Sequence, residues 1–433
     1  MDSPRFPIIE FPHLDNVELP RFRRVRLPQP LGVAIGDLAN PVSQALAGIV
    51  GLNRLAAGAS IAVAIGSRGI SRIDEVAIAV VAYLKQRGYK PFIVPGMGSH
   101  GGGTAEGQVS VLGKLGITEE KVGCEIRSTM ETVDYGEIEP GIRSRFDKNA
   151  AGADGVVVVN RVKAHTSFDR PIESGIVKMV AVGLGKQEGA LNVHLTGPRG
   201  LSEILPKLAA RALERAPICA GLALMEDAAK NLIHVGGVEV ADFFTNDEKL
   251  LKIAKSMMAL LPFDQMDGLI VEEIGKDISG TGVDPAISGR ADIRGLSNPK
   301  PFIHKLAILG LTVKSEGNAM GIGLADYVTH EAVENLDLKS IYMNGLTATL
   351  VEKSRIPVVL KNDRVVMKAV AATCWQIETA KMRIAHIRNS LFLHEVMMSE
   401  PLYEEIRERD GVEALSEPEP PRFDNQGKLT SRI

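Results

Sequence analysis

The chain is poor in the features that mark several large classes of protein. It has only three cysteines, Cys124, Cys219 and Cys374, which lie far apart without a C-x-x-C pair, so neither a disulfide framework nor a thiolate metal site is indicated. Aromatic residues make up 4% of the chain, too few for a surface that stacks single-stranded nucleic acid. The formal net charge of −3 gives no electrostatic footprint for DNA or RNA.

Long apolar runs are missing as well. No run of about 18 apolar residues occurs, and the first residues lack the apolar core of a signal peptide, so we expect neither a membrane span nor export. These absences predict a cytoplasmic protein with no nucleic-acid or membrane partner. The oligomeric state has no signature in the sequence.

What the sequence does contain is typical of an α/β enzyme. The continuous apolar run over 60–66 predicts a strand buried on both faces, and 91–95 predicts the next strand. Between them, apolar residues from Ile73 to Leu84 form one helical stripe, preceded by S-R-I-D (71–74), which resembles a capping box. A strand, a helix and a second strand in this order predict a parallel sheet.

The same alternation continues, and at 433 residues the chain exceeds one ordinary core. We expect two α/β domains with largely parallel sheets, an N-terminal one over 1–262 and a C-terminal one over 263–433 with a polar, Pro-rich tail from about Ser416 that is mobile or draped. The further strands expected are 155–160, 221–225, 233–240, 267–274, 306–311 and 356–360, and the further helices are 172–184, 201–215, 247–261, 338–353 and 373–384.

Polar residues follow three of these strands, where parallel sheets bind ligands. His100 stands among five glycines in G-M-G-S-H-G-G-G, after the strand over 91–95. Arg68 and Arg72 follow the strand over 60–66, where a guanidinium can clamp a carboxylate or phosphate, and both can equally be solvated surface residues. His165 follows the strand over 155–160. Three separate turns thus bring His or Arg to one edge of one sheet, and a histidine can exchange a proton near neutral pH.

Two further residues belong to the segment that follows His165. Lys178 lies in the apolar stretch G-I-V-K-M-V-A-V-G-L-G, where a lysine either extends to solvent or is desolvated and chemically useful. His194 follows 16 residues later and, taken alone, suits a core histidine equally well. The sequence has no H-E-x-x-H, P-loop, nucleophile-elbow or standard dinucleotide fingerprint.

Taken together, these segments resemble the nickel-dependent lactate racemase family. The resemblance is carried by R-G-I-S-R (68–72), M-G-S-H-G-G (97–102), A-H-T-S-F…E-S-G-I-V-K (164–178) and N-V-H (192–194), and more loosely by G-K-D-I-S-G-T-G-V-D-P (275–285). The family holds a nickel-pincer nucleotide, a pyridinium mononucleotide with two sulfur arms that is tethered to a lysine. One protein histidine completes the coordination of the nickel.

The resemblance implies a role for each matching residue. Lys178 matches the tether, His194 the nickel ligand, and His100 and His165 the two acid/base histidines. Arg72, or Arg68 one turn earlier, matches the arginine near the substrate carboxylate. The implied reaction inverts C2 of a 2-hydroxy acid: one histidine takes the hydroxyl proton while hydride leaves C2, and the other serves the mirror reaction. A lone imidazole and sulfur donors suit nickel.

This chain departs from the family pattern beside the expected substrate site. The 13 residues from His165 to Lys178 exceed the family's spacing, and D-R-P-I-E (169–173) replaces a turn of Gly and aromatic residues. The second domain offers Lys276 as the counterpart of a family lysine in an interdomain cleft. The substrate is therefore lactate or a longer, aromatic or sugar acid.

Two other functions stay open from the residues alone. One is a metal-dependent lyase or hydrolase that uses His100, His165 and His194 as three metal ligands. The other is a non-catalytic module that binds a sugar acid or nucleotide.

Overall fold

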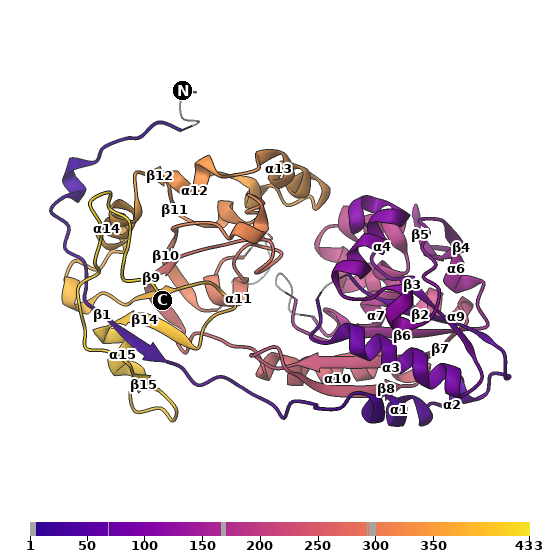
Figure 1. Cartoon of the computed structure of the whole chain (residues 1–433). Helices are drawn as coiled ribbons and strands as arrows, with labels where there is room; N and C mark the ends of the chain where they lie inside the picture. Colours follow the sequence, from indigo (N-terminus) through magenta and orange to yellow (C-terminus); the bar gives the residue numbers. More distant parts are fainter. Residues whose placement is uncertain (1–5, 68, 166–169, 292, 294–299) are drawn as a thin grey trace. The chain divides into compact units, whose positions relative to one another are not determined.

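The computed structural model describes residues 6–67, 69–165, 170–291, 293 and 300–433. The chain divides into two compact units, one of residues 30–258 and the other of residues 1–29 together with 259–433 (Figure 1). Each is an α/β unit with a largely parallel sheet, so the predicted fold class is confirmed. No helix in the described part of the chain is long and apolar enough to cross a membrane.

The unit of residues 30–258 is built on a five-stranded sheet of order β3-β2-β6-β7-β8, in which only β7 and β8 pair antiparallel. The strands are β2 (Ser60–Ile65), β3 (Lys90–Pro95), β6 (Gly155–Arg161), β7 (Ile218–Glu226) and β8 (Leu232–Val238), and a separate hairpin contains β4 (Thr132–Glu139) and β5 (Ile142–Asp147). The helices are α1 (Ala39–Ala47), α2 (Val50–Asn53), α3 (Ile73–Gln86), α4 (Ala105–Lys114), α5 (Glu119–Val122), α6 (Lys148–Ala151), α7 (Gly175–Lys178), α8 (Lys186–Leu195), α9 (Leu205–Arg215) and α10 (Phe243–Ser256), with π-helical turns η3 (Met179–Gly183) and η4 (Gly200–Ile204) and 3₁₀ turns η2 (Gly101–Gly103) and η5 (Val240–Asp242).

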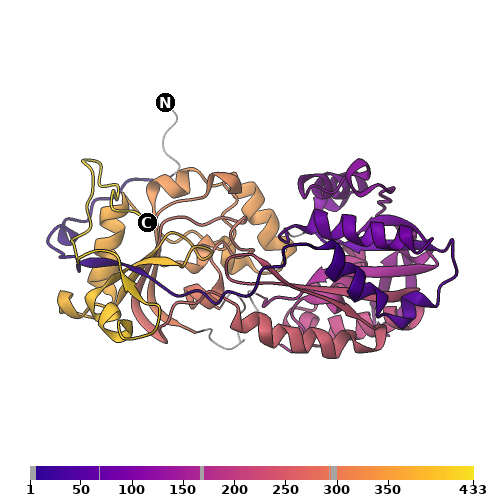
Figure 2. The same cartoon turned by 60° about the horizontal axis from the view of Figure 1, so that its bottom comes forward.

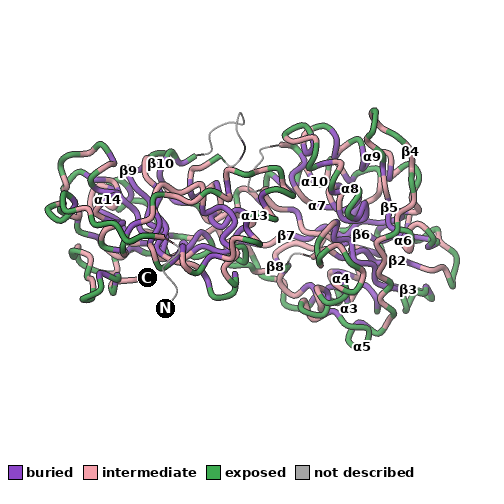
Figure 3. Tube along the Cα trace, turned by 90° about the horizontal axis from the view of Figure 1, so that it is seen from above, coloured by how far each residue is buried: buried purple, intermediate pink, exposed green. Residues whose placement is uncertain are grey.

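Helices cover both faces of this sheet, which explains its continuous apolar strands. Along β2, Ala62 and Ala64 pack into one core with α7, α9 and α10. The alternate residues Ile61, Val63 and Ile65 pack into the other with α1, α3 and α4. Figure 3 shows the buried residues concentrated along these central strands. Because helices cover both faces of the sheet, we expect a ligand to bind beyond the carboxyl ends of its strands.

The other unit has an eight-stranded sheet of order β12-β11-β10-β9-β13-β14-β1-β15, parallel from β12 to β13 and antiparallel beyond. Its strands are β1 (Phe22–Arg26), β9 (Gln265–Val271), β10 (Phe302–Ile308), β11 (Tyr327–Thr329), β12 (Val358–Leu360), β13 (Ile384–Ile387), β14 (Glu395–Ser399) and β15 (Glu413–Ala414). Its helices are α11 (Pro285–Ser288), α12 (His330–Glu334), α13 (Leu338–Thr347), α14 (Asp363–Thr373) and α15 (Glu400–Ile406), with 3₁₀ turns η1 (Pro12–Leu14), η6 (Val313–Ser315), η7 (Ile322–Leu324), η8 (Val351–Ser354) and η9 (Thr379–Lys381).

The domain assignment of the first residues is corrected by this sheet. A continuous N-terminal domain over 1–262 was expected, but residues 1–29 belong to the unit of 259–433. The reason is pairing: β1 lies between β14 and β15, as the indigo strand beside the yellow ones shows in Figures 1 and 2. The tail is draped over this same unit, where Glu419 bridges to Phe22 and Leu429 is buried.

Two local predictions are also corrected. The helix expected over 373–384 is α14 (Asp363–Thr373) instead, capped by the Asn362 side chain and followed by Trp375 at a φ of 64°, which a helix cannot continue through. The expected capping box over 71–74 does not form. Arg72 occupies the cap position at a φ of 57° without a side-chain cap, and the Ser71 amide donates to Glu226 Oε1 at 2.5 Å.

Candidate active site

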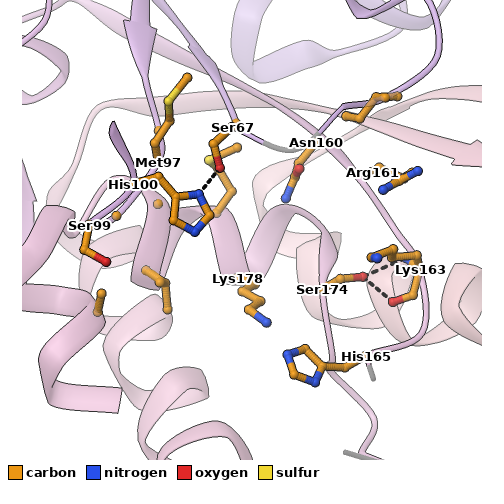
Figure 4. A pocket seen from close by; sticks show the side chains of 18 of the residues that line it. Ser67, Met97, Ser99, His100, Asn160, Arg161, Lys163, His165, Ser174 and Lys178 are labelled. Carbon is orange, nitrogen blue, oxygen red and sulfur yellow. Dashed lines mark hydrogen bonds between the residues drawn. The ribbon is translucent and has the colours of Figure 1, made fainter. Parts of the chain in front are cut away.

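One pocket of about 230 Å³ lies within the unit of residues 30–258, at the carboxyl ends of β2, β3 and β6. The segments that follow these strands form its wall together with α7, η3 and α8. His100, His165, Lys178 and His194 all line this pocket. The structure therefore brings together four of the predicted site residues, at the edge of the sheet where ligands are expected. Figure 4 shows Lys178 extending, in this view, between His100 and His165.

His100 is held on a glycine-rich turn directly after β3. Its backbone amide donates to Met97 O at 3.1 Å. Gly101 follows at a φ of 69°, and a Cβ there would lie 2.6 Å from the backbone of Gly107, so only glycine fits at that position. The His100 ring is fixed by a hydrogen bond between its Nδ1 and Ser67 Oγ, drawn as a dashed line in Figure 4.

The segment that carries His165 is organised by the buried carboxylate of Glu173. It accepts hydrogen bonds from the amides of His165 and Arg170, at 2.7 and 2.9 Å, and from Lys255 Nζ at 2.6 Å. Beside it, Ser174 Oγ accepts from the Lys163 amide at 2.7 Å and donates to Lys163 O at 2.6 Å. Within D-R-P-I-E, Glu173 thus binds backbone rather than lining the pocket, and it sets the position of His165.

Lys178 ends the short helix α7, which starts at a constrained glycine. Gly175 has a φ of 88°, and a Cβ there would lie 2.5 Å from the carboxyl group of Asp247. Asp247 Oδ2 accepts from the Val177 amide at 2.8 Å, and burial raises the pKa of Asp247 to about 7. Lys178 Nζ donates to Glu173 O at 3.2 Å. Its side chain is partly buried and lines the pocket.

The α-helical turn that carries Lys178 continues as the π-helical turn η3, and π-turns occur frequently at functional sites. His194 lies in the last turn of α8 and is exposed, so it is not a core histidine. Among the described residues no group of three or more His, Cys, Asp and Glu side chains is placed to hold a metal ion. The three-histidine centre of the lyase or hydrolase hypothesis is therefore not assembled here.

The charged side chains in the described lining of the pocket are basic. Arg161, Lys163 and Lys178 line it, whereas no described Asp or Glu does. Arg161 forms an ion pair with Glu226, and their side chains are only 11% and 4% exposed. Arg161, Lys163 and Ser67 were not predicted as site residues. Arg161 is the last residue of β6 and Lys163 follows it, so both resemble the ordinary end of a strand, and a serine in a turn carries no signal without its partner.

The structure places Arg72 and Lys276 in other settings. Arg72 is absent from its described lining, and the Arg72 guanidinium binds the Glu75 carboxylate at 2.6 and 2.8 Å and the carbonyls of Ile35 and Gly36. Arg68 lies outside the described residues. Lys276 belongs to the unit of residues 259–433, where its Nζ donates to Asn344 Oδ1 at 2.5 Å. The substrate contacts expected of Arg68, Arg72 and Lys276, and the interdomain cleft, stay predictions.

The sequence matches no protein-family model and no curated protein. Among solved structures, a Thermotoga maritima protein from the Northeast Structural Genomics Consortium is similar with a TM-score of 0.49 at 16% identity, over 74% of this chain and 84% of its own. The lactate racemase apoprotein from Thermoanaerobacterium thermosaccharolyticum is similar with a TM-score of 0.44 at 10% identity, over 81% of this chain and 91% of its own. Both are similarities between structures at low sequence identity, and they assign no role to any residue of this chain.

Proposed function

We propose that this protein is an isomerase that inverts C2 of a 2-hydroxy acid, with a nickel-pincer nucleotide tethered to Lys178 and His194 as its protein ligand for nickel. The observation that carries the proposal is the meeting of His100, His165, Lys178 and His194 in one pocket. These residues come from the turn after β3, the segment after β6, helix α7 and helix α8, and packing alone gives no reason for three histidines and a lysine to share a cavity.

The residues present fit such a group in their donor chemistry. Besides His100 and His165, the lining offers the amine of Lys178 and the imidazole of His194, as a tethered group that brings its own metal donors requires. The cavity of about 230 Å³ is smaller than the ~300–1,000 Å³ of pockets that enclose drug-sized ligands. A cavity of this size would hold a small acid beside only part of such a group. The chemistry that this group supplies when bound is reversible acceptance of the C2 hydrogen as hydride.

The protein's own part is proton transfer and orientation. His100 and His165 line one pocket on separate segments, so each can serve one of the two enantiomers by taking and returning the proton of its hydroxyl. Because Ser67 engages Nδ1 of His100, the proton passes through Nε2. Lys163 and Arg161 line the pocket and orient the carboxylate of the substrate.

The direct test uses protein produced in cells that make the cofactor, incubated with single enantiomers of several 2-hydroxy acids and analysed by chiral chromatography. We expect the unaltered protein to invert at least one acid. The rate of inversion should fall by about 10²–10⁴-fold in His100→Gln and His165→Gln, and Lys178→Ala should show no inversion. His13→Gln, an exposed histidine of the other unit, is the matched control. Nickel-loaded protein that inverts none of the acids would contradict the proposal. Binding of an acid without turnover would favour the non-catalytic binding module. Retention of metal by Lys178→Ala would favour a metal centre formed by protein side chains alone.

A further inference from the structure

A buried lysine beside the pocket, Lys186, has no part in the proposed chemistry. It begins α8, its side chain is 0% exposed, and its φ of 54° is one that residues other than glycine adopt at a cost. Its Nζ lies 2.8 Å from Asp147 Oδ2, and that side chain is also 0% exposed. Burial lowers the pKa of Lys186 and raises that of Asp147. A buried ion pair is weak evidence for stability, because desolvation offsets the attraction.

The ammonium group of Lys186 is directed at the turn that carries His100. It donates to Pro95 O, at the carboxyl end of β3, at 2.6 Å, and to Gln108 Oε1 at 3.0 Å. Gln108 on α4 is itself fully buried. Because its oxygen accepts from an ammonium, its Nε2 must be the end that faces the turn.

Gln108 completes the connection to His100. Its Nε2 donates to Gly98 O at 3.0 Å and to His100 O at 3.4 Å. Gly98 has a φ of 59° and lies between the end of β3 and the 3₁₀ turn η2, so no strand ladder or helix fixes its carbonyl. The buried side chain of Gln108 supplies that restraint.

We propose that Lys186 positions His100: it orients the Gln108 amide, which holds the carbonyls of the His100 turn and so places the imidazole beside Ser67 and the pocket. The expected effect of Lys186 on turnover rests on the proposed function. Its effect on the position of the His100 ring does not depend on that function. Lys186 is a positioning residue, not a catalytic one, because it is absent from the pocket lining in the described residues.

Two variants separate positioning from folding. Gln108→Glu keeps an acceptor for Lys186 and removes only the amide donor, whereas Lys186→Met combined with Asp147→Leu removes both charges together and leaves neither unpaired. Leu46→Ala, in the core of the same unit on α1, is a destabilised control that does not touch the turn. Thermal unfolding shows which variants are folded.

The first readout needs no activity. In protein labelled at its histidine rings, with His100 assigned from His100→Gln, both variants should shift and broaden the His100 ring resonances and leave those of His194 unchanged. Leu46→Ala should change neither. In the loaded enzyme, kcat should fall by about ten- to a hundredfold with KM altered much less, since a misplacement near 1 Å can cost that much.

A folded Gln108→Glu variant whose His100 resonances match those of the unaltered protein would overturn the proposal. So would a double variant whose His100 resonances are unchanged. If the loaded enzyme inverts no acid, the proposed function fails, and the resonances still decide the positioning role.

Discussion

At the scale of single residues, the hydrogen bond between Ser67 and His100 is the contact that most directly controls a proposed acid/base group. It joins the ends of two adjacent parallel strands, β2 and β3, and fixes both the rotation of the ring and the nitrogen that exchanges a proton. To take a proton at Nε2, the neutral imidazole carries its hydrogen on Nδ1 and donates it to Ser67 Oγ.

Replacing Ser67 by Ala should lower kcat by about tenfold, with little change in KM. A tenfold change corresponds to the free energy that one net hydrogen bond contributes. The reason is that the ring loses its fixed orientation while the carboxylate-binding side chains stay. Ser99→Ala, another serine of the pocket lining, is the matched control. Steady-state kinetics on both enantiomers check this. Equal losses in both variants would argue against a specific role of Ser67.

The residues that the sequence could reveal carry signals of different kinds. His100 and Lys178 stand in glycine-rich or apolar surroundings where their type is unusual, whereas His165 is found by its place after a strand and His194 by the family resemblance. Ser67 and Lys186 act only through partners that are remote in the chain, such as Asp147. Their roles depend on contacts that the order of residues does not contain.

At the scale of elements, helix α7 depends on a partner in α10. The carboxyl group of Asp247 binds the amide of Val177 at the start of α7, and Asn160 Nδ2 donates to Gly175 O at 2.6 Å. Lys178 is thus held at the end of a one-turn helix that could not persist alone.

Asp247→Asn should change how stability depends on pH. The folded pKa of Asp247 is raised to about 7 by burial, above the ~3.9 of an unfolded aspartate, so the folded protein keeps a proton that the unfolded chain releases. The contribution of Asp247 to the free energy of unfolding is therefore largest below about pH 4 and declines by ~1.4 kcal/mol per pH unit until about pH 7. Asn cannot titrate, so the variant should lose this slope.

Denaturant unfolding of both proteins at several values of pH across this range measures the difference. Asp154→Asn, an exposed carboxylate of the same unit, is the control. A difference between variant and unaltered protein that does not change with pH would refute the raised pKa.

The elements themselves were predicted where one pattern dominates. β2 and β6 are continuous apolar runs that the sheet buries on both faces, so their identity is plain from sequence. The hairpin of β4 and β5 was missed because its residues mix charged and apolar types and are mostly half-buried. The helix misplaced at 373–384 depends on the backbone of Trp375, which local composition does not specify.

At the scale of the whole molecule, the N-terminal segment belongs to the unit that is distant in sequence. Phe22 on β1 is 2% exposed and pairs with Ser399 of β14. No local signal could assign this strand, because its partners follow hundreds of residues later.

Phe22→Ala should therefore destabilise the unit of residues 259–433 by about 3–5 kcal/mol, the usual cost of truncating a buried phenylalanine. Hydrogen exchange should quicken in β9 and β14 and stay unchanged in β2 and β6. Val33→Ala, at an 89% exposed position, is the control. Faster exchange in β2 and β6 alone would contradict the assignment of β1.

The central claim is that Lys178 carries a nickel-pincer nucleotide in the pocket it shares with His100, His165 and His194. Mass spectrometry of native protein, intact and after digestion, tests it most directly. The account predicts an added mass confined to the peptide that contains Lys178, one nickel per chain, and neither in Lys178→Ala. An active, nickel-containing protein with an unmodified Lys178 would contradict it.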